Sequence, residues 1–234
     1  MSFFTPWLVA VLFSGCAVPE SELTPTPIDA PPVMAASKKP RIVAAIRRDQ
    51  RLVQDHGDHF RLWNDTGILV AIDDEGTWIG SRSAEKGTAS SEEWGFYLGE
   101  PTVSRGTFVP TGRRVLKERQ PSAGLFTLKL QHIWGEEHLE NRIDGVEQSF
   151  RIESAPIGRG LVEVRLHRFD DSDMDCQSVN ESDVALSHDG EVVLTYQDLK
   201  VNDAEGRSLT ASLACDSNDL VVTFDDHHAV YPVT

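Results

Sequence analysis

The feature that most constrains the fold of this 234-residue chain is a succession of short β-rich runs separated by turn residues. From residue 41 onward, apolar residues alternate with polar ones in segments such as 59–63 and 67–73. Such runs return about every ten residues, and no long stretch shows the 3.6-residue periodicity of an amphipathic helix. The pattern predicts an all-β fold, and its spacing is typical of an antiparallel β-sandwich.

Further strands are expected along the rest of the chain, separated by turn signals rich in Gly, Asp, Asn and Ser. Segment 41–54 is ambiguous, because it also fits a short helix packed on the sandwich. Segment 153–160 is a possible boundary between two β layers or two packed subdomains. The further expected strands are residues 94–98, 113–118, 125–134, 145–153, 161–168, 191–196, 208–213, 220–224 and 229–233.

The first fifteen residues have the composition of an export signal. They contain no charged side chain, and their apolar run 3–13 is too short to cross a bilayer as a helix. The following sequence, Leu-Phe-Ser-Gly-Cys at 12–16, resembles a bacterial lipobox, in which small residues admit the peptidase and the cysteine thiol receives the lipid. Phe13 is larger than usual, and Lys and Arg are missing before the run. We therefore expect residues 1–15 to be a lipoprotein signal peptide and Cys16 to be lipidated; a plain signal peptide or a short buried helix is the alternative.

Residues 16–41 are expected to form a tether between the lipid and the folded part. The stretch after Cys16 carries six prolines and almost no large apolar groups, so it cannot bury enough surface to offset its chain entropy. Proline-rich chain is stiff and extended, which would hold the domain of residues 42–234 away from the membrane. Ala17 fits sorting to the outer membrane.

Charge and cysteine content limit the partners and the compartment. The formal net charge of −15 disfavours nucleic acid, because phosphate binding needs clustered Lys and Arg. If Cys16 is lipidated, the other two cysteines, Cys176 and Cys215, form an even pair in an oxidising compartment. We predict a disulfide between them, with two separate buried thiols as the alternative.

The second half of the chain resembles the N-terminal β-rich domain of large exported FG-GAP repeat proteins of myxobacteria and their relatives. That family places the domain before integrin-like propeller repeats and attaches no catalytic activity to it, so the resemblance implies a structural or adhesion-associated module. Here the repeats do not follow, and the domain is expected to stand alone. The matching segments are 145–150, 155–156, 161–164, 194–199, 203–207 and 229–234.

One acidic stretch has a partial calcium-loop pattern. Asp171, Asp173 and Asp175 repeat the first three acidic positions of such a loop. Cys176 stands in place of the turn glycine, however, and Ser182 in place of the bidentate glutamate. We expect no cofactor, and weak calcium binding at these three aspartates is the alternative to a solvated acidic loop.

The histidine pairs are weaker metal candidates. His56 and His59 flank Asp58, and His227 and His228 follow two aspartates, but neither spacing is a recognised ligand set. Neighbouring residues on a strand face opposite sides, so the second pair could share an ion only in a turn. Residues 132–138 lack helical His-Glu-x-x-His spacing and are predicted to be a strand end and a turn.

Four tryptophans and one polar pair are further candidates for a binding site, each with a structural alternative. The tryptophans at 63, 78, 94 and 134 suit either core packing or a sugar-stacking platform. Glu147 and Gln148, beside Phe150, suit a polar pair at a sheet edge rather than a site. No Gly-x-Ser-x-Gly elbow is present in the sequence.

Together these features predict a non-catalytic lipoprotein of the bacterial cell envelope. It would bind the membrane through its lipid anchor, and its β domain would serve a structural or protein-interaction role with a surface protein or a polysaccharide. The alternatives are a carbohydrate- or calcium-dependent ligand-binding lipoprotein and a hydrolase whose site has no sequence signature.

Overall fold

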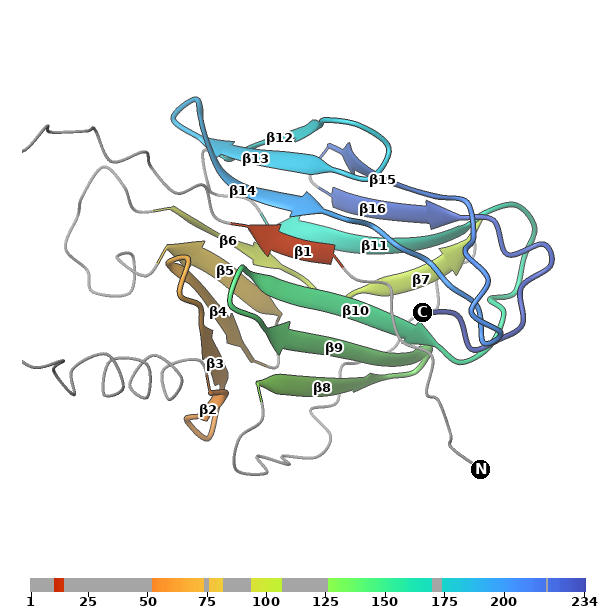
Figure 1. The fold of residues 1–234 in the computed structure, drawn as a ribbon, viewed down its shortest axis with the longest axis horizontal. Coiled ribbons are helices and arrows are strands. Elements are labelled where there is room, and N and C mark those ends of the chain that lie inside the picture. Colours follow the sequence, from red (N-terminus) through yellow and green to blue (C-terminus); the bar gives the residue numbers. More distant parts are fainter. Residues whose placement is uncertain are drawn as a thin grey trace, which may run out of the picture.

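The computed structural model describes residues 11–14, 52–73, 76–81, 94–106, 126–169, 174–217 and 219–234. Throughout these residues the regular secondary structure is β, without a helix. Each of their paired strands runs antiparallel to its neighbours, in a seven-stranded and a nine-stranded sheet. The predicted all-β class and antiparallel sandwich are confirmed (Figure 1).

The seven-stranded sheet is built mainly from the second half of the chain. Its two hairpin groups, β8 to β10 and β12 to β14, are joined through β1, which comes from the N-terminal segment. In spatial order the strands are β12 (Met174–Ser178), β13 (Val184–His188), β14 (Glu191–Gln197), β1 (Val11–Ser14), β10 (Val146–Ile152), β9 (Gly135–Asn141) and β8 (Thr127–His132).

The nine-stranded sheet begins with a run of consecutive strands, β2 to β6, and continues into the C-terminal hairpin. β7 (Thr102–Arg105) pairs with the same strand, β11, that β6 and β16 pair with. In spatial order the others are β15 (Ala211–Asp216), β16 (Asp219–Phe224), β11 (Val162–Phe169), β6 (Gly95–Leu98), β5 (Thr77–Ser81), β4 (Ile68–Ile72), β3 (Phe60–Trp63) and β2 (Gln54–Asp55).

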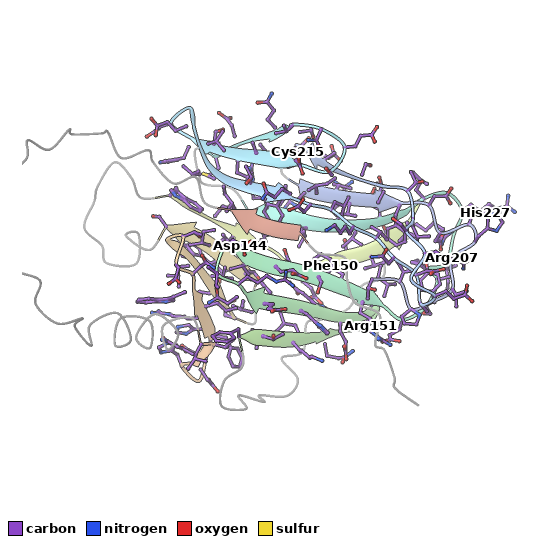
Figure 2. The ribbon with its side chains drawn as sticks, viewed as in Figure 1. Asp144, Phe150, Arg151, Arg207, Cys215 and His227 are labelled. Atoms are coloured by element: carbon purple, nitrogen blue, oxygen red, sulfur yellow. A yellow bond between two sulfur atoms is a disulfide. The ribbon has the colours of Figure 1, made fainter. Side chains whose placement is uncertain are left out.

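Both sheets contribute apolar side chains to one core. Leu62 and Leu98 come from the nine-stranded sheet, and Leu139, Phe150 and Leu194 come from the seven-stranded sheet. Buried and half-buried residues alternate along β3, so that strand buries one face, whereas nearly every residue of β10 is buried. Phe150 appears at the centre of the sandwich in Figure 2.

Several expected elements differ in detail. The expected strand at 113–118 lies outside the described residues, and so does all of segment 41–54 except its last three residues, which lead into β2. The strand expected at 208–213 is found at Ala211–Asp216. Residues 229–233 form no strand; Val233 instead makes an isolated bridge to Ile152. Segment 153–160 is where the chain passes from β10 of one sheet to β11 of the other.

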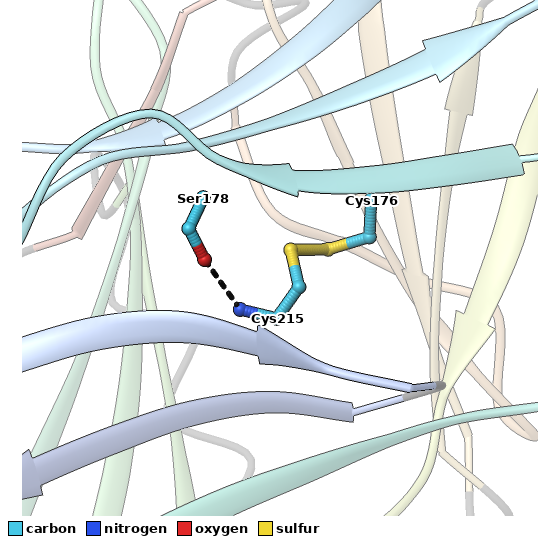
Figure 3. Close-up of a disulfide and its surroundings, with 3 residues drawn as sticks. All are labelled: Cys176, Ser178 and Cys215. Atoms are coloured by element: carbon cyan, nitrogen blue, oxygen red, sulfur yellow. Dashed lines mark hydrogen bonds between the residues drawn. A yellow bond between two sulfur atoms is a disulfide. The ribbon is translucent and has the colours of Figure 1, made fainter.

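The predicted disulfide is present and joins the two sheets. Cys176 lies on β12 and Cys215 on β15, with 5.9 Å between their Cα atoms (Figure 3). The Cys215 backbone N–H also donates a hydrogen bond to Ser178 Oγ over 3.1 Å. The bond therefore fixes an edge strand of one layer to an edge strand of the other.

The turn between β8 and β9 requires glycine. Gly135 has φ of 149°, and a Cβ atom placed there would lie 1.9 Å from the carbonyl oxygen of Arg151 on β10. Its backbone approaches β10 more closely than any side chain would allow. This turn sets the position of the two residues that flank it, His132 and Glu137.

Candidate functional site

A polar cluster lies buried in the seven-stranded sheet, and it is the strongest candidate for chemistry in the described chain. His132 ends β8, Glu137 lies on β9 and Gln148 on β10. Both His132 and Glu137 have side chains that are 0% exposed, and His132 Nε2 is 3.0 Å from Glu137 Oε2. Gln148 Nε2 donates a hydrogen bond to Glu137 Oε1 over 2.7 Å. Three neighbouring strands thus hold these groups in one network.

The imidazole of His132 is held from several sides. Its Nδ1 is 3.2 Å from Glu100 Oε1, which is partly exposed, so the ring lies between two carboxylates. The indole of Trp134 stacks on the imidazole with ring centroids 4.6 Å apart and an interplanar angle of 7°. Trp134 in turn donates its Nε1–H to the carbonyl oxygen of Pro101 over 3.1 Å. The stack and the two ring contacts fix the orientation of the imidazole.

Tyr196 on β14 borders the same cluster. Burial raises the pKa of its phenol well above the usual value, and the charge of Glu137 adds to the effect. The carboxylate of Glu137 and the imidazole of His132 are groups that can exchange a proton, whereas the Gln148 amide does not titrate and only donates a hydrogen bond. Within the part of the chain that the structure describes, the side chains of Glu137 and His132 are both 0% exposed. A buried network of this kind orders the core around it.

The outer face of the nine-stranded sheet carries a second candidate, an aromatic surface. Trp63, Trp78 and Tyr97 are half-buried there on β3, β5 and β6. The indole of Trp78 lies across Gly80 and the neighbouring strand's glycine, since a Cβ on Gly80 would be 2.4 Å from the ring. Flat aromatic faces of this type stack on sugar rings as readily as on protein.

Leu69 lies at the centre of this outer face. It is in register with Trp63 on one side and with Gly80 on the other, and it is only 2% exposed although it is outside the central core. The tryptophans divide evenly: Trp94 and Trp134 pack against the core, as core packing predicts, whereas Trp63 and Trp78 face outward.

The remaining predicted site residues are not brought together. Cys16, Asp171 and Asp173 lie outside the described residues. Asp175 is exposed on β12, where it pairs in register with Ser187. The described residues contain no group of three His, Cys, Asp or Glu side chains arranged to hold a metal ion.

The two histidine pairs are engaged locally. His59 contacts Asp58 through Nδ1 at 2.6 Å and accepts a hydrogen bond from Arg61 at Nε2, and its ring stacks on that of His56. His227 and His228 lie in a turn, with ring centroids 4.3 Å apart.

The aspartate before this turn, Asp226, is already bound within the protein. It accepts a hydrogen bond from the Tyr231 hydroxyl over 2.6 Å and pairs with Arg105. Burial and the bond to Asp226 raise the pKa of Tyr231. Asp226 is thus committed to fastening the C-terminal segment to β7.

A second buried aspartate, Asp203, organises the loop of residues 203–207 and holds it against the C-terminal segment at Val230. Asp203 accepts hydrogen bonds from the side chain of Arg207 and from the backbone N–H groups of Glu205, Arg207 and Val230. Burial works to raise the pKa of Asp203, but these hydrogen bonds outweigh it and bring the pKa to about 2. Arg207 and His227 lie at the same end of the molecule in Figure 2.

The expectation for Glu147 and Gln148 is corrected by the structure. They do not lie at a sheet edge, because β10 is paired on both sides, with β9 and β1. Both residues are 1% exposed. Alternation along β10 would have shown that Gln148 shares the inner face with Val146 and Phe150, but its partner Glu137 carries no sequence signal.

Comparisons with protein-family models, with curated proteins and with solved structures found no match for this chain. Among the described residues, none belongs to a helix long and apolar enough to cross a membrane.

Proposed function

We propose that the protein is a lipid-anchored lipoprotein of the bacterial cell envelope whose β-sandwich acts by binding a partner and not by catalysis. The lipobox-like run at residues 12–16 and the proline-rich stretch after it support the anchor and the tether. A disulfide between Cys176 and Cys215 fits an oxidising compartment outside the cytoplasm. Ala17 supports an outer-membrane location.

The observation that carries the binding role is the complete burial of the His132 and Glu137 side chains. These two form the best acid–base pair among the described residues, and their hydrogen-bonding groups are used inside the core. A general base must lie within hydrogen-bond reach of its substrate, which the surrounding strands prevent here. The resemblance of residues 94–234, strongest after residue 145, to domains of exported FG-GAP repeat proteins supports the same non-catalytic role.

Lipidation is tested by growing cells that express the protein with an alkyne analogue of palmitate. The wild-type chain should be labelled, and the Cys16→Ser variant should not be. A Cys215→Ser variant is the matched control, because it removes a thiol elsewhere and should keep the label. Label on the Cys16→Ser variant, or none on the wild type, would overturn the anchor.

A second candidate, carbohydrate binding, is favoured by the outward aromatic surface of Trp63, Trp78 and Tyr97. Affinity electrophoresis in gels containing envelope polysaccharide would show retardation of the wild type if these rings stack on sugars. The Trp78→Ala variant should then migrate freely. Trp94→Ala is the control, since that ring packs against the core. Equal migration of all three chains with and without polysaccharide would exclude this candidate.

A further inference from the structure

The position between β10 and β14 in the seven-stranded sheet is filled only by the N-terminal strand β1. β1 pairs antiparallel with β10 through Val11 to Phe13 and with β14 through Leu12 to Ser14. β10 and β14 do not pair with each other, and they run parallel to one another as a result (Figure 1). β1 is therefore a central strand of this sheet, yet its residues belong to the segment that leader cleavage removes.

Loss of β1 would leave a vacancy one strand wide. Neighbouring strands lie about 4.8 Å apart, so β10 and β14 would face one another across roughly 9.6 Å. The backbone N–H and C=O groups that now pair with β1 would be left without partners on both edges, at residues 146–148 and 195–197. Such paired, unsatisfied edges are templates for another strand.

The side chains beside the vacancy specify what can fill it. Val146, Gln148 and Tyr196 lie on the inner face next to β1, and each is at most 1% exposed while β1 is in place. An occupant must therefore place apolar side chains at the positions of Val11 and Phe13.

The outer face next to the vacancy is acidic at its centre. Glu147 is in register with Leu12 and is 1% exposed, and it pairs with Arg142. Gln197 flanks the same position from β14. Arg142 and Lys200 already act on the Glu147 carboxylate. A Lys or Arg at the position of Leu12 would add a further cation there, in a protein whose formal net charge is −15.

We propose that the processed protein binds an extended segment of a partner protein as an antiparallel strand between β10 and β14. The segment carries apolar residues at its two inner positions and a basic residue between them. This inference rests on the proposed function, because the vacancy arises only when cleavage before Cys16 removes β1. The leader would then hold the sheet in its folded arrangement until the partner strand takes over.

The test uses wild-type protein purified from membranes and a fluorescent synthetic peptide with the sequence of residues 5–15. We expect saturable binding, together with slower hydrogen exchange at residues 146–148 and 195–197. The same peptide with Phe13→Pro loses a backbone donor and should bind more than about tenfold more weakly. The peptide with Leu12→Lys should bind more tightly than the parent. The Cys16→Ser chain, which keeps its leader, is the filled control and should not bind.

The two proposals fail in different ways. An intact mass that includes residues 1–15 would overturn the lipoprotein and the strand-binding proposal together. A processed chain that does not bind the peptide, or whose β10 and β14 amides are already protected without it, would overturn strand binding alone. Amides of β10 and β14 that are protected without the peptide would mean that the protein closes the sheet with its own chain.

Discussion

Removal of the Cys176–Cys215 disulfide provides a quantitative test of how the two sheets are held together. The two cysteines are 39 residues apart and join edge strands of opposite layers. In the loop-entropy model, closing a loop of about 40 residues destabilises the unfolded chain by about 4 kcal/mol. The Cys176→Ala/Cys215→Ala double variant should lose about that much free energy of unfolding.

Urea unfolding at pH 7, followed by tryptophan fluorescence, measures this loss. Wild-type protein treated with dithiothreitol keeps both sulfur atoms and should lose a similar amount, because the loop opens in both cases. The matched control is Val179→Ala, which trims an exposed side chain inside the same loop and should leave the unfolding free energy nearly unchanged. A loss below about 1 kcal/mol in the double variant would refute the view that this bond restrains the two layers.

Three other substitutions test particular contacts. Asp203→Asn should flatten the pH dependence of the unfolding free energy. The stabilising contribution of the wild-type carboxylate is present above its unfolded pKa of about 4 and is lost as the pH falls toward its folded pKa of about 2. Thermal melts of the two chains whose midpoints change equally between pH 4 and pH 2 would contradict this. Gly135→Ala should destabilise by about 3 kcal/mol or more. Gly190→Ala, at a φ of 80° and with open space around its Cβ position, should cost only about 1 kcal/mol in urea titrations. Asn64→Ala removes hydrogen bonds to three acceptors in the β9–β10 hairpin and should lower the unfolding free energy by about 2 kcal/mol. The control Asn180→Ala, at an exposed position, should change the urea midpoint little. Equal effects of the two substitutions would refute the role of Asn64.

The class of fold was accessible from sequence because alternation and turn residues are local signals. β9 was missed for a physical reason: its sequence from Gly135 to Asn141 is mostly polar. Glu137 on that strand is buried only because His132 and Gln148, from the two neighbouring strands, satisfy its carboxylate. Such pairing between strands leaves no trace in the period of a single strand.

The pairing of Cys176 with Cys215 was predictable for a different reason, since it followed from cysteine parity and compartment and not from geometry. The division of the tryptophans was only partly accessible. Alternation places Trp63 on the opposite face from Leu62, but which face of β3 meets the other sheet depends on how the layers pack. The place of β1 between β10 and β14 had no sequence signal, because a signal-peptide core and a buried strand share the same apolar composition.

Intact-mass spectrometry of the membrane-extracted protein is the direct test of the proposed cleavage before Cys16 and of lipidation at that residue. The mass should lack residues 1–15 and include acyl chains, and the N-terminal peptide should begin at a modified Cys16. A mass that retains residues 1–15, or a Cys16 without lipid, would contradict this proposal.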